Sequence, residues 1–260
     1  MSMATRKYRT IFISDIHLGS RGCKADSLCH FLKHNTCETL YLVGDIVDGW
    51  RLQRSWYWPQ AHSNVLRRLL TAAKRDTKIH YIAGNHDEAI RPWLKHIPAI
   101  GNVEFSNRQD HWGLDGRRYL VVHGDMFDGL MAATSGKFIM HIGDWLYDLL
   151  IKLNDLHAWI RQKLGFSYWS MSAWIKKNTK QAVGYVMDFE GLLVNYCKSK
   201  GYDGIICGHI HTPAIKNIDG ITYMNDGDWV ESCTALVEHW DGSWEILHWT
   251  EHEQDHTADI

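Results

Sequence analysis

The chain has 260 residues, 45% of them hydrophobic, and its formal net charge is −2 at pH 7. A chain of this length can bury one large core, and so small a charge creates no field that would attract nucleic acid. We therefore expect a single domain over residues 1–260 that does not bind nucleic acid. The sequence contains no run of about 18 apolar residues, so no membrane-spanning helix is expected.

Cysteine usage and the first residues favour a cytoplasmic protein. The six cysteines are scattered without C-x₂-C spacing, which fits reduced thiols better than a zinc knuckle or a disulfide framework. Residues 1–8 contain no apolar core of a secretory signal and run directly into the first expected strand. A cytoplasmic enzyme is the simplest class that fits both observations.

The first half of the chain alternates between strand and helix patterns. Apolar, β-branched runs predict strands at 11–13, 40–43, 79–82 and 119–122. Helices are expected at about 24–35, 60–75 and 88–97. The second of these begins just after Pro59, a residue that suits the start of a helix. This alternation predicts an α/β fold.

The pattern changes after residue 125. From about 126 to 200 apolar residues recur near helical spacing with no strand pattern, which predicts a helical insertion that caps the site. Strand patterns return at 203–207, 221–224, 235–240 and 243–249. In the last hairpin, Trp240, Trp244 and Trp249 are expected to pack against a sheet.

Five short polar motifs each follow an expected buried strand. They contain Asp15 with His17, Asp45, Asn85 with His86, His123, and His209 with His211. Ligands of α/β sheets bind at the carboxyl ends of strands, so we expect these groups to share one rim. Asp15 and His17 are two residues apart, so on a strand they would point the same way. His209 and His211 would share a side on a strand, whereas a loop could direct them to different ions.

The residue types indicate a dinuclear metal site. Carboxylates, an amide oxygen and imidazoles suit Mn²⁺ best, with Fe or Zn²⁺ as alternatives, and disfavour Ca²⁺. Two such ions can hold the attacking and leaving oxygens of a phosphoryl displacement, and Asp45 is the candidate for the shared carboxylate. Alone, the D-x-H pair or the G-D pair is better explained as a helix cap or a turn, whereas G-N-H-D is a stronger signal and G-H-x-H after a buried strand is stronger again. Five in order, each after a strand, make that structural explanation improbable.

The order D-x-H, G-D, G-N-H-D, H-G-D, G-H-x-H resembles the calcineurin-like metallophosphoesterases from about residue 10 to about 249. Within that family, residues 13–19, 41–50 and 225–229 are similar to the branch of UDP-2,3-diacylglucosamine diphosphatases in lipid A synthesis. The resemblance implies an αββα metallophosphoesterase sandwich with a helical lid insertion. It implies one ion held by Asp15, His17, Asp45 and His211. It implies a second held by Asp45, Asn85, His123 and His209.

The resemblance also implies a reaction. A diphosphate would be hydrolysed to UMP and 2,3-diacylglucosamine 1-phosphate, with His86 outside the ligand shell as the catalytic residue that assists the leaving group. Asp48 or Asp87 would orient His86. An arginine is common at this position in the lipid A branch, so His86 leaves a soluble nucleotide or phosphodiester hydrolase as the alternative. A non-catalytic scaffold on the same fold is a further alternative, although all seven ligand-type residues are present.

The expected insertion carries a second signal. Between His157 and Lys180 five basic residues and no acidic residue alternate with aromatic side chains, three of them tryptophans. A helix pair with buried aromatics and solvated lysines explains this about as well as a lid that binds acyl chains, a diphosphate or an anionic membrane surface. By resemblance, Asn85, Asp128, Lys177 and Lys180 would contact the substrate. The sequence does not indicate an oligomeric state.

Overall fold

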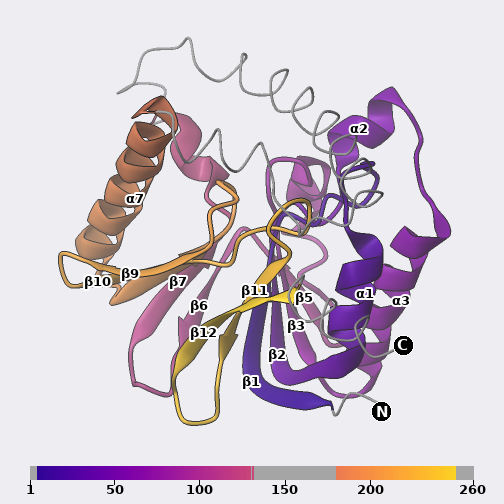
Figure 1. Ribbon diagram of the computed structural model, residues 1–260, viewed down its shortest axis with the longest axis horizontal. Helices are drawn as coiled ribbons and strands as arrows, with labels where there is room; N and C mark the ends of the chain where they lie inside the picture. The colour runs from indigo at the N-terminus through magenta and orange to yellow at the C-terminus, as the bar shows by residue number, and fades with distance from the viewer. Residues whose placement is uncertain (1–4, 130, 132–179, 250–260) are drawn as a thin grey trace, which may run out of the picture. The chain divides into compact units, whose positions relative to one another are not determined.

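The computed structural model describes residues 5–129, 131 and 180–249 (Figure 1). The chain forms two compact units, one of residues 1–125 with 193–260 and one of residues 126–192. Both β-sheets belong to the first unit. The fold that positions the polar motifs is therefore contained in that unit.

The larger sheet has seven strands in the order β12-β11-β1-β2-β3-β5-β4. Their bounds are β1 Arg6–Ile13, β2 Asn35–Val43, β3 Lys78–Ile82, β4 Ala99–Ile100, β5 Val103–Ser106, β11 Thr234–Glu238 and β12 Trp244–His248. The strands β1, β2, β3 and β5 are parallel, so their carboxyl ends meet at one edge. The strands β11, β12 and β4 pair antiparallel at the two sides.

The smaller sheet has five strands in the order β6-β7-β8-β10-β9. Their bounds are β6 Arg108–Trp112, β7 Arg118–Val122, β8 Gly204–Cys207, β9 Ala214–Ile218 and β10 Ile221–Asn225. The central strands β7, β8 and β10 are parallel, whereas β6 and β9 are antiparallel edge strands. In the sequence, β7 precedes the second unit and β8 follows it, yet the two strands pair directly in this sheet.

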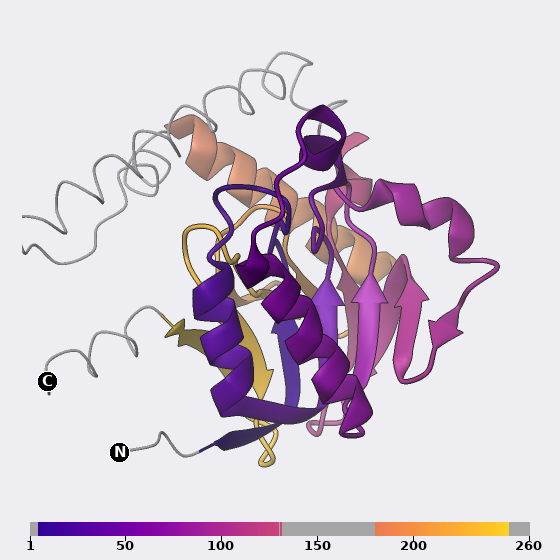
Figure 2. The same cartoon turned by 90° about the vertical axis from the view of Figure 1, so that its right-hand side faces the viewer.

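Helices cover the outer face of the larger sheet. The helices α1 (Ala25–His34) and α3 (Gln60–Lys74) lie side by side over its strands, as Figure 2 shows from that side. Each presents apolar residues at helical spacing, and these share one core with alternate residues of the strands. The core contains Ile11, Ile13, Leu28, Phe31, Leu40, Leu42, Val65, Leu69 and Ile79.

The two sheets pack face to face through the other side of the same strands. The residues between them are Phe12, Tyr41, Val43 and Ile82 of the larger sheet and Tyr119, Val121, Ile206 and Met224 of the smaller. Because strand side chains alternate, one face of β1 and β2 meets the helices while the opposite face meets the second sheet. Two-sided burial explains why these strands read as continuous apolar runs.

A final helical segment borders the smaller sheet. In α7 (Lys180–Lys200), the buried residues Leu193, Val194 and Cys197 belong to the first unit. The Cys197 thiol lies 3.8 Å from the carbonyl oxygen of Gly204 in β8. Helix, sheet, sheet and helix follow one another, so the predicted αββα sandwich is confirmed.

The predicted elements are largely confirmed, with two corrections. Residues 88–97 do not form an α-helix; a 3₁₀ helix, η1 (Glu88–Trp93), contains Pro92, which lacks the N–H that an α-helix needs. Trp240 does not pack on a sheet: it is 54% exposed in the β11–β12 turn, whereas Trp249 is buried. The short helices α2 (Gly49–Arg54) and η2 (Asp125–Phe127) were not expected from the sequence.

The predicted insertion at 126–200 overlaps the second unit, but residues 132–179 lie outside the described residues. The helical lid and its basic and aromatic side chains therefore stay predictions. Within the described residues, no helix has the length and apolar character to cross a membrane.

Candidate metal centre

The five motifs converge at the carboxyl ends of parallel strands. Asp15 follows β1, Asp45 follows β2 and Asn85 follows β3, all in the larger sheet. His123 follows β7 and His209 follows β8 in the smaller sheet. The site is thus built from both sheets.

The backbone at these positions is unusual. Eight described non-glycine residues have positive φ, and five of them are expected ligands, namely Asp15, His17, Asp45, His209 and His211. The left-handed region costs a non-glycine residue about 1 kcal/mol or more, so packing must hold it. Backbone hydrogen bonds do so: Asp15 donates to the Gly44 carbonyl (3.0 Å) and His17 to the Asp45 carbonyl (2.9 Å).

Asp15 and His17 do lie close together, but strand alternation is not the cause. They are not alternate residues of a strand, because β1 ends at Ile13. Two left-handed residues beyond the strand bring the side chains together instead. The ring of His209 lies 5.0 Å from that of His123, whereas His211 approaches Asp15, so the loop directs the two histidines to different partners.

Glycine is required beside two of these residues. Gly44 has φ +86°, and a Cβ there would collide with the His123 ring. A Cβ on Gly208 would collide with the side chains of Ser14 and Asp15. Only the absence of a side chain lets these turns pass so close to the polar groups.

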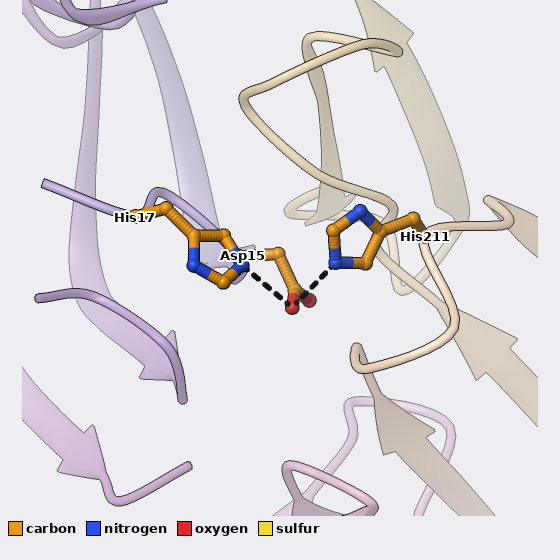
Figure 3. Close-up of side chains that lie close together, drawn as sticks. All are labelled: Asp15, His17 and His211. Atoms are coloured by element: carbon orange, nitrogen blue, oxygen red, sulfur yellow. Dashed lines mark ion pairs between the residues drawn. The ribbon is translucent and has the colours of Figure 1, made fainter. Parts of the chain in front are cut away.

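The Asp15 carboxylate lies between two imidazoles (Figure 3). Its Oδ1 is 3.0 Å from Nε2 of His211 and 3.8 Å from Nε2 of His17. Burial of Asp15 opposes its ionisation, but the nearby His211 and His123 outweigh burial and hold its pKa well below the usual range. A buried, ionised carboxylate between imidazoles is one half of a metal site.

Asp45 occupies the centre of the second group. Its Oδ2 lies 3.3 Å from Nε2 of His123, 3.8 Å from Nε2 of His17 and 3.9 Å from Nε2 of His86. Burial opposes ionisation here too, yet His123 and His17 lower the pKa of Asp45. One carboxylate that faces groups on both sides is the arrangement that a bridging ligand needs.

The residues present fit divalent cations. The Nδ1 atom of His123 lies 2.8 Å from the Val43 carbonyl and donates to it, which leaves Nε2 directed at the site as a metal ligand requires. Within the described residues, the buried Oδ1 of Asn85 has no hydrogen-bond partner, and the buried Nε2 of His123 has only its 3.3 Å ion-pair contact with Asp45, without hydrogen-bond geometry. Buried polar atoms of this kind are costly unless they are paired, and cations would pair them.

Three sets of ligand atoms lie within 4.8 Å of one another: Asp15, His17 and His211; His17, Asp45 and His86; and Asp15, Asp45 and His123. Asp15, His17 and Asp45 each belong to two sets. The sets overlap as the ligands of two neighbouring ions would. The assignment of individual ligands to each ion stays a prediction.

Asp48 orients His86. Its Oδ1 is 2.9 Å from Nδ1 of His86, and its Oδ2 is 3.4 Å from Nδ1 of His17. The same carboxylate accepts from the backbone N–H of Arg51 at 3.0 Å and caps α2. Burial opposes ionisation of Asp48, but His17 and His86 lower its pKa. Asp48 therefore joins an expected ligand to the expected catalytic residue.

Asp87, the other candidate for this task, has a different role. Its Oδ1 accepts from the Val47 N–H at 2.8 Å and its Oδ2 from the Ile46 N–H at 3.1 Å. It thus ties the loop after β3 to the loop that carries Asp45. Burial, and then the charge of Asp45, raise the pKa of Asp87.

Ser14 and Asp226 reach the site without having been identified from the sequence. The Ser14 hydroxyl lies 2.6 Å from Oδ2 of Asp15 and 2.6 Å from Oδ1 of Asp226. Both residues are buried. Residues 13–19 and 225–229, which contain Ser14 and Asp226, were singled out for their resemblance alone, and neither residue was assigned a role.

The structure leaves the remaining substrate contacts as predictions. Asp128 and Lys180 belong to the second unit, in which Lys180 begins α7. Lys177 lies outside the described residues.

Comparison with known proteins identifies the family. The sequence model of the calcineurin-like phosphoesterases matches residues 8–213 of the chain. The chain belongs to this family. The match spans the five motifs described above, and the Asp and His side chains that these motifs bring together fit divalent metal binding.

Individual relatives are more distant. A UDP-2,3-diacylglucosamine hydrolase of Stenotrophomonas maltophilia is 24% identical over 248 residues, which cover 87% of this chain and 93% of that protein. The DNA polymerase II small subunit of Methanothermobacter thermautotrophicus is 29% identical over 162 residues, half of this chain but only 33% of the relative's length. A solved phosphoesterase from E. coli, Yfce, aligns over 92% of this chain with 16% identity and a TM-score of 0.44.

Proposed function

We propose that the chain hydrolyses the diphosphate of UDP-2,3-diacylglucosamine to UMP and 2,3-diacylglucosamine 1-phosphate. The observation that carries this proposal is the similarity to a UDP-2,3-diacylglucosamine hydrolase over 87% of this chain and 93% of the relative. Nearly complete coverage of both proteins favours a shared substrate class more than a partial match to a much longer subunit does.

In this proposal seven residues hold the cations: Asp15, His17, Asp45, Asn85, His123, His209 and His211. Mn²⁺ is the first choice for this mixed oxygen and nitrogen set, with Fe or Zn²⁺ as alternatives. Two bound divalent cations would activate water and neutralise the charge that develops on phosphorus. Burial of Asp15 and Asp45 strengthens these electrostatic interactions because it excludes water from them.

His86 assists departure of the leaving group. Its Nε2 is directed toward Oδ2 of Asp45 at 3.9 Å, and Asp48 holds Nδ1, so Nε2 is the nitrogen that faces the reacting atoms. An imidazole there can donate a hydrogen bond or a proton to the oxygen that leaves phosphorus. Asn85, Asp128, Lys177 and Lys180 would bind the substrate, the lysines through its diphosphate.

The proposed setting is the cytoplasm, with contact at the inner face of the membrane. A diacylated substrate resides in a bilayer, and the basic and aromatic residues between His157 and Lys180 suit an anionic lipid surface.

His86 favours a second candidate, a soluble nucleotide or phosphodiester hydrolase. An imidazole oriented by Asp48 needs no lipid to act, and the lipid A branch commonly has arginine at this position. A smaller substrate would use the same metal centre.

Hydrolysis assays with Mn²⁺-loaded protein separate the two candidates. The probes are UDP-2,3-diacylglucosamine in detergent, soluble UDP-N-acetylglucosamine and bis(4-nitrophenyl) phosphate. We expect the lipid-linked substrate to have the highest kcat/KM, because only its acyl chains gain from apolar burial, at about 25 cal/mol per Å². A higher kcat/KM on either soluble probe would transfer the assignment to the second candidate.

The role of His86 has its own test. His86→Ala should lower kcat by about 10²- to 10⁴-fold, the usual contribution of an acid–base group. The metal content should stay that of the wild type, as measured by plasma emission spectrometry. Loss of bound metal would instead make His86 a ligand.

A further inference from the structure

Trp50 packs directly on the imidazole of His86. The two ring centroids are 4.3 Å apart and their planes are inclined by 38°. The indole N–H donates to Oε1 of Glu88 at 3.0 Å, which fixes the orientation of the indole. Trp50 is 37% exposed, so burial in the core does not explain its position.

Two further contacts complete the surroundings of the His86 ring. Asp48 lies 2.9 Å from Nδ1, and the ring of His17 meets His86 edge to face at 4.6 Å. Trp50 therefore adds a third contact to the imidazole. Together the three contacts limit rotation of the ring and keep Nε2 facing Asp45.

The backbone carries Trp50 and Glu88 to the same place. The Gly49 N–H donates to the His86 carbonyl at 3.1 Å, and a Cβ on Gly49 would lie 2.9 Å from that oxygen. Trp50 follows Gly49 in α2, and Glu88 opens η1 two residues after His86. The close approach of the two loops sets the indole against the imidazole.

Trp56 provides an internal comparison. It lies on the same segment and is 76% exposed, and its ring stacks on Trp58 at a centroid distance of 6.1 Å. An exposed tryptophan on this segment thus has another partner available. Trp50 contacts His86 because of where it lies in α2, and Trp56 on the same segment stacks on Trp58 instead.

We propose that Trp50 and Glu88 are positioning residues that hold the His86 imidazole for catalysis. This inference rests on the catalytic role of His86 in the proposed function. Glu88 acts through Trp50, and Trp50 acts through His86. A displaced imidazole would still leave the metal ligands in place.

The test compares Trp50→Ala, Trp50→Phe and Glu88→Gln with Trp56→Ala as the matched control. With 2′,3′-cyclic AMP as substrate, whose leaving group is an alkoxide that needs a proton, Trp50→Ala should lower kcat by about 10- to 10²-fold, the loss expected from a misplaced catalytic group. KM and metal content should stay near those of the wild type. Trp50→Phe should restore most of kcat, Glu88→Gln should cost less than Trp50→Ala, and Trp56→Ala should have no effect.

A double mutant separates positioning from general damage. Once His86 is absent its orientation has no meaning, so Trp50→Ala in the His86→Ala background should cause no further loss. NMR of histidine-labelled, metal-free protein gives a readout independent of turnover. The His86 ring protons should carry an indole ring-current shift that Trp50→Ala removes and Trp56→Ala retains.

The outcomes distinguish this inference from the proposed function. Normal turnover in His86→Ala would refute the role of His86 and the inference with it. A slow His86→Ala protein together with equal kcat in Trp50→Ala and Trp56→Ala would leave the proposed function intact and overturn the inference. Loss of metal in Trp50→Ala, or full additivity in the double mutant, would also overturn it.

Discussion

Two buried clusters of carboxylate and imidazole groups among the described residues of the first unit differ in how charge is balanced. In one cluster, Glu238 accepts from Arg9 at 2.6 Å, from the Thr10 hydroxyl at 3.0 Å and from the Leu114 N–H at 2.8 Å. Nε2 of His111 lies 3.0 Å from the same carboxylate. A permanent cation and several donors satisfy both oxygens of Glu238.

In the metal centre, Asp48 is paired with Arg51 at 3.4 Å, but Asp15 and Asp45 have no arginine or lysine partner among the described residues. In the part of the chain that the structure describes, the ion pairs of Asp15 and Asp45 are all with histidines. Burial opposes the positive charge of His17, but Asp15 and Asp48 raise its pKa to about 10. These carboxylates thus stabilise the protonated form of the His17 imidazole. A bound metal ion can take the place of that proton.

The difference shows what each cluster is for. A buried carboxylate with its own arginine contributes to folding, because its charge is balanced within the chain. Two buried carboxylates that rely on imidazoles leave room for cations from solution. Both clusters are buried, so the two differ in the cation that faces their carboxylates and not in burial.

The variant Asp45→Ala tests the difference between the two clusters with the largest expected effect. Loss of the shared carboxylate should lower kcat/KM by about 10⁴-fold and reduce bound metal, because both ions would lose a ligand. Turnover and metal content are the measurements, with circular dichroism to verify the fold. Glu238→Gln serves as the control and should keep both properties. Near-normal turnover in Asp45→Ala would exclude a bridging role.

A second variant changes Ser14, whose hydroxyl hydrogen-bonds the expected ligand Asp15. Ser14→Ala removes the hydroxyl beside Asp15, and partners of metal ligands usually contribute about 10- to 100-fold to metal affinity. Isothermal titration with Zn²⁺ would measure the loss. Thr10→Val is the matched control, because Thr10 lies in β1, the strand that Ser14 follows, and its hydroxyl donates to Glu238, so metal affinity should stay unchanged. Equal effects of the two variants would contradict the distinction between the clusters.

The smallest effect concerns the pH dependence of stability. Burial opposes ionisation of Glu238, but His111, the Leu114 N–H and Arg9 lower its pKa from 4.5 to about 2. A lowered pKa contributes stability above the unfolded value of 4.5, and the contribution is lost as pH falls toward 2. Glu238→Gln should therefore cost about 1–2 kcal/mol at pH 7, after allowance for solvent screening.

Denaturant titrations across pH check this expectation. The difference in unfolding free energy between wild type and Glu238→Gln should shrink between pH 4.5 and about 2. A difference that stays constant over this range would mean that the charge of Glu238 does not contribute.

The sequence predicted the positions of eight of the twelve described strands and the polar motifs that follow them, because both follow from local patterns, whereas β4, β5, β6 and β9 were not predicted. Buried parallel strands read as apolar runs, and their carboxyl ends had to share an edge. The bend that brings Asp15 to His17 was not predictable, since left-handed residues depend on hydrogen bonds from the Gly44 and Asp45 carbonyls.

The partners of the site were harder to infer than its ligands. Asp48 and Asp87 are equally plausible partners of His86 in sequence, and only their positions distinguish an imidazole contact from backbone contacts. Ser14 and Asp226 are more than 200 positions apart, so no local pattern joins them. The helix expected at 88–97 failed because Pro92 outweighed a helical apolar spacing.

The left-handed backbone at five expected ligand positions has an evolutionary consequence. Glycine adopts that conformation without strain, so replacing such an aspartate or histidine by glycine would relieve both backbone strain and charge repulsion. Selection for folding alone would therefore erode this site, because stability and activity make opposite demands on the same positions. Descendants relieved of catalysis should lose these side chains first while their two sheets persist.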